Sequence, residues 1–194
     1  MYYTKEVFAK YDKKTIRVYQ AYCQEIAEEA VKLQNFGEHY NFNRMTWIKP
    51  SFLWMMYRSN WGTKKNQEHI LALDIYQESF LKLLSQAVLT APETSGGAEW
   101  EKAFSETAVY CQWDSDRSMN GNALQRGAIQ IGLKGSALKE FLGNGICRIE
   151  DLTPQVRKWN TSRKNNKLKS SDLPVEKLFP VGDKKVRKSL DFSE

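Results

Sequence analysis

Residues 15–37 read TIRVYQAYCQEIAEEAVKLQNFG and join two different periodicities in one short stretch. Residues 15–22 alternate as a β-strand does, so every second side chain faces the same way. One face of this predicted strand carries Ile16, Val18, Gln20 and Tyr22, and the other carries Arg17, Tyr19 and Ala21. Residues 23–35 place small or apolar side chains on one side and Glu and Lys on the other, which is typical of an amphipathic helix. A strand that leads directly into a helix indicates a mixed fold.

Outward from this stretch, strand and helix patterns continue to alternate. Further strands are predicted at 68–75, 107–113, 127–133 and 145–149. Further helices are predicted at 50–60, 76–90 and 135–142, and from Thr153 onward. Turn residues predict a surface loop at 91–99, and a loop at 114–122 would join two strands into a hairpin. We therefore expect an α+β fold in which helices pack against one β-sheet that is mixed, or split.

The positive charge of this chain is unevenly distributed. The 194 residues carry a net charge of +6. Residues 1–156 are neutral overall, whereas residues 157–188 hold 11 basic and 3 acidic side chains. We expect a single globular α+β domain over residues 1–160 and a basic C-terminal tail over 161–194. Such a tail can attract phosphate backbones or an anionic surface, although a solvated chain end gives the same composition.

Several classes of protein are disfavoured by the sequence. The longest apolar run, at 52–57, is too short to cross a bilayer, so no membrane partner is expected. The first residues lack the apolar stretch of a secretory signal, and the three cysteines form no CxxC pair, which favours the reducing cytoplasm. His39 and His69 are far apart, and no phosphate loop, GxGxxG or GxSxG motif is present. We expect neither a metal centre nor a serine hydrolase.

The most unusual block is RMTWIKPSFLWMMYRSNW, residues 44–61, which contains three of the six tryptophans. On a helix, four of its side chains would share one stripe at i, i+3, i+4 and i+7. These side chains are Trp54, Tyr57, Arg58 and Trp61, and the cations Arg44 and Lys49 lie nearby in the sequence. An aromatic stripe with guanidinium groups can hold a planar base and its phosphate. A buried core helix would explain the same pattern, so both interpretations stay open.

A second group of polar residues surrounds the predicted hairpin. It consists of Trp113 and Asp114 together with Asp116, Arg117, Arg126 and Gln130. Polar side chains at strand ends can line a cleft, but a half-exposed sheet produces the same alternation. Near the next helix, Asp151 and Thr153 are candidate helix caps.

Four segments carry a resemblance to a known family. They are TIRVYQAY at 15–22, RMTWIKPSFLWMMYRSNW at 44–61, QWDSDRS at 112–118 and RGAIQIGLKG at 126–135. Over roughly residues 5–160 the chain resembles the family called domain of unknown function 4291, which implies a compact domain that folds alone.

The chain is also distantly similar to the ADP-ribosyltransferase superfamily, which implies an NAD cleft in a split sheet. The similarity implies that Arg17 contacts the cofactor, that Tyr57 stacks on the nicotinamide and that Glu150 is the catalytic acid, with Asp114 as the alternative acid. The residues that would bind NAD are Arg17, Tyr19, Arg44, Trp47, Lys49, Trp54, Arg58 and Trp61.

Three functions follow from these patterns. The first is an NAD-dependent ADP-ribosyltransferase-like enzyme, with nucleic acid as one acceptor. The second is a non-catalytic nucleic-acid or nucleotide-binding domain, in which Trp54, Tyr57 and Trp61 stack on bases. Its phosphate contacts would be Arg126, Arg157, Arg163, Lys164 and Lys167. The third is an interaction module whose aromatic block is only core. The enzyme hypothesis requires Arg17, Arg44, Tyr57 and Arg58 to open onto one shared pocket.

Overall fold

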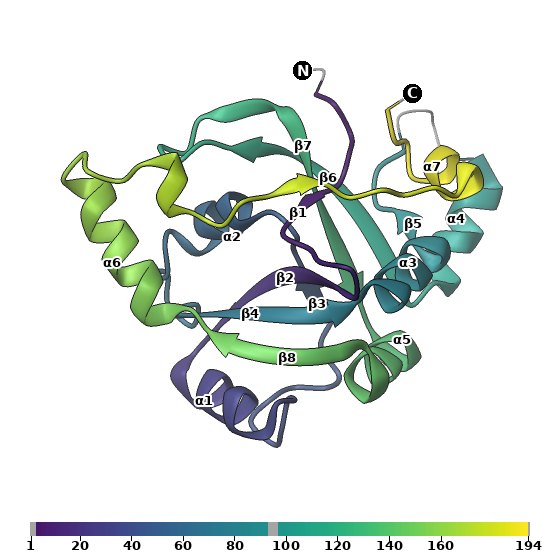
Figure 1. Cartoon of the computed structure of the whole chain (residues 1–194). Helices are drawn as coiled ribbons and strands as arrows, with labels where there is room; N and C mark the ends of the chain where they lie inside the picture. Colours follow the sequence, from purple (N-terminus) through teal and green to yellow (C-terminus); the bar gives the residue numbers. More distant parts are fainter. Residues whose placement is uncertain (1–2, 93–96, 194) are drawn as a thin grey trace.

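The computed structural model describes residues 3–92 and 97–193, which adopt an α+β fold with a split sheet (Figure 1). The strands are β1 (Phe8–Ala9), β2 (Thr15–Tyr22), β3 (Thr46–Ile48), β4 (His69–Tyr76), β5 (Val88–Leu89), β6 (Val109–Arg117), β7 (Ala123–Leu133), β8 (Ile146–Asp151) and β9 (Lys177–Leu178). They form a three-stranded sheet in the order β2-β4-β8, a four-stranded sheet in the order β3-β7-β6-β5, and the pair β1-β9. Only β5 and β6 pair in parallel among these described strands, so the four-stranded sheet is mixed.

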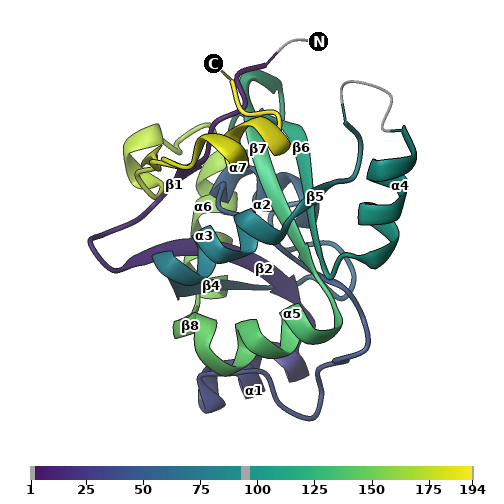
Figure 2. The same cartoon turned by 90° about the vertical axis from the view of Figure 1, so that its right-hand side faces the viewer.

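The helices cover the two larger sheets from several sides (Figure 2). They are α1 (Gln24–Leu33), α2 (Phe52–Ser59), α3 (Gln77–Gln86), α4 (Gly97–Glu106), α5 (Gly135–Glu140), α6 (Thr153–Lys164) and α7 (Lys184–Ser189). The cap expected at Asp151 or Thr153 is wrong in position, because Leu152 is the N-cap of α6 and makes no side-chain cap hydrogen bond. Asp151, one residue earlier, accepts the N–H of Thr153 at 2.8 Å, and the Thr153 hydroxyl accepts the N–H of Ile70 at 3.0 Å. Within the described residues, no helix is long and apolar enough to span a membrane.

The main core lies where the two larger sheets approach each other. Ile16 and Val18 of β2 face it together with Leu73 of β4, and Ile129 and Ile131 of β7 meet them from the other sheet. These side chains are almost fully buried. The predicted alternation in β2 is confirmed, because Tyr19 on the opposite face belongs to a different cluster.

A second core lies on the other face of the three-stranded sheet, under α2 and α6. It contains Tyr19 of β2, Phe52 and Met56 of α2, and Val156 of α6. The ring of Phe52 meets the ring of Tyr19 edge-on at 5.4 Å between centroids. Burial on several sides therefore explains why α2 is apolar nearly all round, as the core interpretation of this block predicted.

Helix α2 is shorter than its sequence pattern predicts. Ser51 caps its start by accepting the N–H of Trp54 at 3.2 Å. The helix ends at Ser59, because Asn60, Trp61 and Gly62 have backbone φ angles of 49°, 56° and 67°. This left-handed conformation is rare for a residue as bulky as tryptophan. Trp61 therefore leaves the helix, and the expected four-residue stripe is wrong at its last position.

The segment expected to be a basic tail is part of the folded body. Strand β9 pairs with β1, and the described part of residues 161–194 contributes several side chains to the main core. These are Phe179, Val181, Val186, Leu190 and Phe192. The boundary at residue 160 does not separate two bodies in the structure. Sequence patterns miss this packing because the apolar residues are irregularly spaced among lysines and contact strands far away in the chain.

The region between β5 and β7 also differs from expectation. The loop predicted at 91–99 ends earlier, since α4 begins at Gly97; residues 93–96 lie outside the described residues. Trp100 and Phe104, one helical turn apart, pack together at 5.1 Å, and Phe104 also contacts Tyr110. The hairpin is confirmed and its loop is shorter than predicted, because β6 continues to Arg117 and β7 starts at Ala123.

Candidate functional site

A buried carboxylate joins the start of α2 to the β6–β7 hairpin. Asp116 is fully buried and accepts hydrogen bonds from three directions. The Ser51 hydroxyl donates at 2.8 Å, the Arg117 backbone N–H at 2.8 Å, and Arg126 through Nε at 2.9 Å and through a terminal nitrogen at 2.5 Å. Because a buried charge is tolerated only when it is paired and hydrogen-bonded, this network fixes the hairpin against α2.

A second carboxylate reaches the same place from the C-terminal segment. One oxygen of Glu176 accepts the backbone N–H of Phe52, the first residue of α2, at 2.6 Å. The other accepts Arg126 at 3.2 Å. Burial raises the pKa of Glu176 to about 7, the bonds from Phe52 and Arg126 oppose this, and the charge of Asp116 adds to it. Glu176 is therefore a carboxyl group that can change charge near neutral pH.

Two adjoining hollows lie beside this network, between α2, the hairpin loop and the C-terminal segment. We call the first the tyrosine hollow; its volume is about 270 Å³. It is lined by Leu53, Tyr57, Asn60, Trp61, Ser118, Met119, Asn120, Gly121 and Arg163. We call the second the glutamate hollow; its volume is about 300 Å³. It is lined by Phe52, Leu53, Ser118, Met119, Arg126, Ser170, Leu173, Pro174 and Glu176. The two hollows share three of these residues and are therefore neighbours.

Tyr57, which lines the tyrosine hollow, stacks on a second ring and on a guanidinium group. Tyr57 is 46% exposed, and its ring lies nearly parallel to that of Trp54, at 5.5 Å between centroids. The guanidinium of Arg117 lies 4.2 Å from the centre of the Tyr57 ring. Arg117 Nε and Trp54 Nε1 are both buried and have no hydrogen-bond partner among the described residues. Gly121, at φ 83°, brings the hairpin loop close to Tyr57.

A second arginine lies over the other aromatic residue of this hollow. The guanidinium of Arg163, on α6, lies 5.0 Å from the centre of the Trp61 ring and donates to the side-chain oxygen of Asn160. Over residues 3–92 and 97–193, no carboxylate forms an ion pair with Arg117 or Arg163. The tyrosine hollow therefore combines the exposed ring of Tyr57 with the positive charge of Arg163, and Arg117 lies against the same ring; no carboxylate of the described residues neutralises either charge.

Arg17 does not open onto these hollows. Its guanidinium binds Asp74 through two bonds, at 2.7 and 2.8 Å, and Glu150 at 2.9 Å. These ion pairs raise the pKa of Arg17, and its side chain is only 10% exposed. Tyr19 on the same strand is fully buried, and desolvation raises its pKa. Arg17 and Glu150, both expected in one NAD cleft, do contact each other, but they form an ion pair and neither residue lines either hollow.

Lys49, Arg58 and Asp114 form a third group, close enough for their charges to interact. Lys49 is buried and donates to the Trp47 carbonyl at 3.2 Å. Desolvation, together with the positive charge of Arg58, lowers the pKa of Lys49 to about 7, and the charge of Asp114 opposes both effects. The carboxylate of Asp114 is held by amide groups, from Gln112 at 3.1 Å and Gln130 at 2.8 Å.

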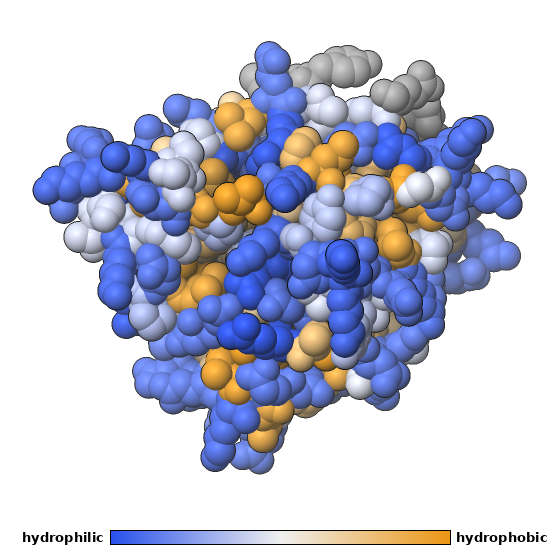
Figure 3. Space-filling model, viewed as in Figure 1, coloured by the Kyte–Doolittle hydropathy of each residue, from blue (hydrophilic) through white to orange (hydrophobic). Residues whose placement is uncertain are grey.

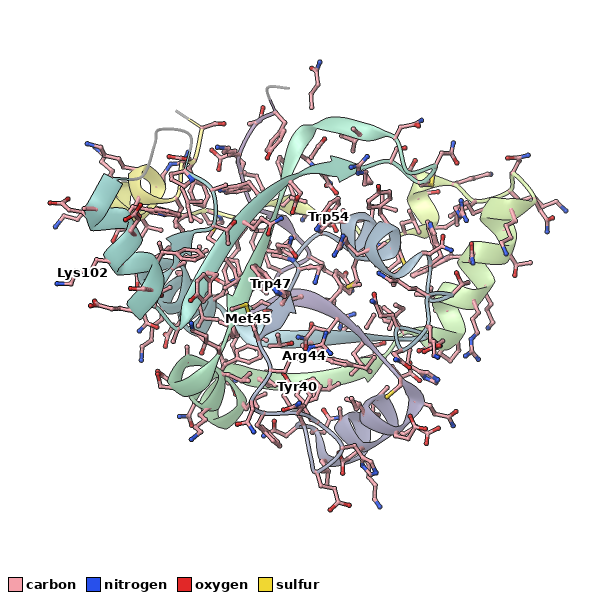
Figure 4. All side chains as sticks on the ribbon, turned by 180° about the vertical axis from the view of Figure 1, so that it is seen from behind. Tyr40, Arg44, Met45, Trp47, Trp54 and Lys102 are labelled. Carbon is pink, nitrogen blue, oxygen red and sulfur yellow. The ribbon has the colours of Figure 1, made fainter. Side chains whose placement is uncertain are left out.

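The remaining predicted residues are dispersed. Figure 4 shows Trp54 beside α2, Trp47 over the middle of the sheet and Arg44 farther away toward β8. Arg44 is exposed, and the Trp47 ring covers Gly132. Arg157, Lys164 and Lys167 are exposed side chains on or just after α6. The shared pocket expected for Arg17, Arg44, Tyr57 and Arg58 is therefore not formed, and the residues assigned to NAD do not fit one cofactor site.

One group among the described residues could present ligands to a metal ion. Oxygens of Glu29 and Glu38 and a nitrogen of His39 lie within 4.8 Å of one another. The Glu29 carboxylate is already occupied, because it accepts the backbone N–H groups of Glu38 and His39 at 3.2 and 3.0 Å. These bonds close the turn after α1, and the group is explained by that role.

Sequence reasoning missed part of the site. Glu176 was not singled out, because a single acidic residue between two prolines in a basic segment has no distinguishing pattern. Met119 and Ser170 also line the hollows and were also not predicted, because they reach the hollows only through contacts between segments distant in the sequence. Arg117 was noticed beside Asp114 and Asp116, but nothing in the sequence indicates that it stacks on Tyr57.

Comparison with known proteins identifies a family whose description states no activity. Residues 6–179 match the family described as Domain of unknown function (DUF4291). This match extends beyond residue 160 and includes Glu176 as well as α2 and the hairpin. No curated protein matches the chain.

Proposed function

Because this chain belongs to the DUF4291 family, whose description states no activity, we propose a function from its geometry: it binds a nucleotide or a short single-stranded nucleic acid in the tyrosine hollow. The observation that carries the proposal is that half-exposed Tyr57 lines this hollow together with Arg163, while the guanidinium of Arg117 stacks on the Tyr57 ring. Among the described residues, neither arginine has a carboxylate partner. Proteins that bind single strands combine stacking rings with a positive groove in this way.

The size and chemistry of the hollow support this ligand class. A volume of about 270 Å³ is near the lower end of small-molecule sites, which typically measure about 300 to 1,000 Å³. A base can stack on the exposed part of Tyr57, while Arg163, which lines the same hollow, attracts a phosphate. The left-handed backbone of Trp61 at the rim is the kind of conformational strain that is often stored at binding sites.

NAD belongs to the proposed ligand class, because it is a dinucleotide with two aromatic rings and a pyrophosphate. The ADP-ribosyltransferase activity stays a prediction. The two residues that it assigns to the cofactor and to catalysis, Arg17 and Glu150, form an ion pair with each other and do not line the hollow that contains Tyr57. Nucleic acid is the ligand favoured by the basic side chains of α6, which extend from the tyrosine hollow along an exposed helix. A cytoplasmic location is part of the proposal and is supported by the three cysteines, all of them free.

The interaction-module alternative has weaker support. The face seen in Figure 3 is mostly hydrophilic, and its apolar side chains form small separate patches. A docking face for another protein is more often a contiguous apolar patch. The aromatic block is partly core, as Phe52 and Met56 show, but half-exposed Tyr57 has no packing role that requires its exposure.

The proposal is tested by fluorescence anisotropy with a labelled oligothymidylate and a labelled oligouridylate, at several salt concentrations. Replacing Tyr57 by alanine should weaken binding by about 1 to 3 kcal/mol, or about 5- to 150-fold, as for other stacked bases. Arg163→Ala should also weaken binding and reduce its dependence on salt. Matched controls are Phe42→Ala, an aromatic residue 43% exposed, and Arg148→Ala, an exposed arginine on β8; neither lines the hollow.

The results separate the alternatives clearly. An equal loss of oligonucleotide affinity in Tyr57→Ala and Phe42→Ala would show that the tyrosine hollow has no special role in binding. Binding that is absent for both oligonucleotides and for NAD would overturn the proposal, while NAD binding without oligonucleotide binding would narrow it to a dinucleotide.

A further inference from the structure

The glutamate hollow contains an acidic side chain in a position suited to a ligand anion. Glu176 accepts the first free N–H of α2 and a terminal nitrogen of Arg126. A backbone N–H at a helix start and a guanidinium are the donors with which proteins bind phosphate. The hollow beside these donors has a volume of about 300 Å³, and Arg126 is 30% exposed. An anion that enters the hollow would therefore compete with the Glu176 carboxylate for the Phe52 N–H and for Arg126.

We propose that the glutamate hollow is a phosphate subsite for the ligand bound in the tyrosine hollow, and that Glu176 competes with this phosphate for Arg126. The inference rests on the proposed function, because the ligand is the same nucleic acid or nucleotide. The two hollows share Leu53, Ser118 and Met119, so a base in one brings the next phosphate of the strand to the other.

The charges around Glu176 explain why the competition depends on its protonation. Arg126 faces it from β7, Asp116 from β6 and Tyr19 from β2, and the Phe52 N–H faces it from α2. Asp116 and Glu176 already share the single guanidinium of Arg126. A phosphate would add a third negative group to one cation unless Glu176 is neutral. Like charges this close disfavour one another, so the phosphate and the ionised form of Glu176 exclude each other.

The direction of the pH effect follows from the pKa of Glu176, which burial raises to about 7. Below this pH the carboxyl is neutral and the subsite is open to a phosphate. Above it the carboxylate occupies the donors, and affinity falls by up to tenfold for each pH unit. Lys49, whose pKa is lowered to about 7, loses charge over the same range. A variant at position 176 is needed to separate the two groups.

The test uses the full chain and a labelled oligothymidylate of about four nucleotides without a terminal phosphate, since phosphodiesters do not titrate near neutral pH. We expect wild-type affinity to fall about tenfold between about pH 6 and about pH 8. Glu176→Gln should bind at both pH values about as tightly as wild type does at the lower one. Glu78→Gln removes an exposed carboxylate from α3 and should keep the wild-type pH dependence.

Each outcome decides between the inference and the function on which it rests. If wild-type affinity does not change with pH while Tyr57→Ala still weakens binding, the subsite is refuted and the proposed function stands. If Glu176→Gln keeps the wild-type pH dependence, another group is responsible and the role of Glu176 is wrong. Should this variant fail to fold, the same pH series on Lys49→Gln decides: a fall in affinity that persists without the Lys49 charge supports Glu176, and a fall that disappears refutes its role. Absence of oligonucleotide binding at every pH would remove the proposed function as well.

Discussion

Replacing Glu176 by glutamine should make the free energy of unfolding rise, relative to that of wild type, as the pH increases from acid to neutral. The side chain lies in a buried network with Asp116 and Arg126. Burial raises its pKa from the ordinary 4.5 to about 7. The folded state therefore binds a proton more tightly than the unfolded state. The stability that comes from this proton is fully present below about pH 4.5 and is lost as the pH rises through about 7.

The magnitude follows from the same two values. The difference between 4.5 and about 7 corresponds to about 3 kcal/mol, at about 1.4 kcal/mol for each pKa unit. Glutamine keeps an oxygen that can accept the Phe52 N–H, and its amide places N–H donors near Arg126. That local change shifts the free energy of unfolding by a constant amount. The pH-dependent part of the difference between variant and wild type is what reports the titration of Glu176.

The assay is urea unfolding, followed by tryptophan fluorescence, of wild type and Glu176→Gln at several values between about pH 4 and about pH 9. The free energy of unfolding of the variant minus that of wild type should increase by about 3 kcal/mol over this range and then level off. Titrating groups that do not interact with Glu176 contribute equally to both proteins and cancel. A difference that stays constant from about pH 5 to about pH 8 would refute the assignment of a raised pKa to Glu176.

Two further predictions concern stability away from the hollows. Arg17→Ala leaves the partly buried Asp74 and Glu150 facing each other without their cation, so the free energy of unfolding in urea should fall by about 3 to 5 kcal/mol. The oligonucleotide affinity of the folded variant should be unchanged. A loss of affinity with unchanged stability would restore Arg17 as a ligand contact. Phe179→Ala removes a fully buried ring from the main core and should lower the free energy of unfolding by about 3 to 5 kcal/mol in the same assay. A negligible decrease would show that residues beyond 160 behave as an appended tail.

Much of the fold could be predicted because it depends on local periodicity. The strand at 15–22 is confirmed residue for residue, since alternation with a period of two is visible within eight positions. The helix at 135–142 is confirmed in position, and it passes directly into a π-helical turn at Phe141–Gly145. Helix α4 was missed because a turn-rich segment precedes it and its apolar residues, Trp100 and Phe104, are few.

The candidate site was predictable only in part. Tyr57, Trp61 and Arg163 were chosen from aromatic and basic composition, and the structure does place all three on one hollow. Arg17 and Arg44 were chosen on the same grounds, but they lie elsewhere. Composition identifies residues able to bind a base or a phosphate, but it contains no information about which of them share a cavity.

The sequence by itself determined the class of the fold, the position of most strands and helices, and the uneven distribution of charge, because each depends on residues close together in the chain. Tertiary structure alone decided that the C-terminal segment belongs to the core, that Arg17 is closed by Asp74 and Glu150, and that Glu176 reaches the start of α2. These contacts join residues that are 57 to 133 positions apart in the case of Arg17, and 124 apart in the case of Glu176. The stabilising free energy of these contacts comes from burial and ion pairing that exist only once the sheets have packed. Local sequence patterns therefore cannot predict these contacts.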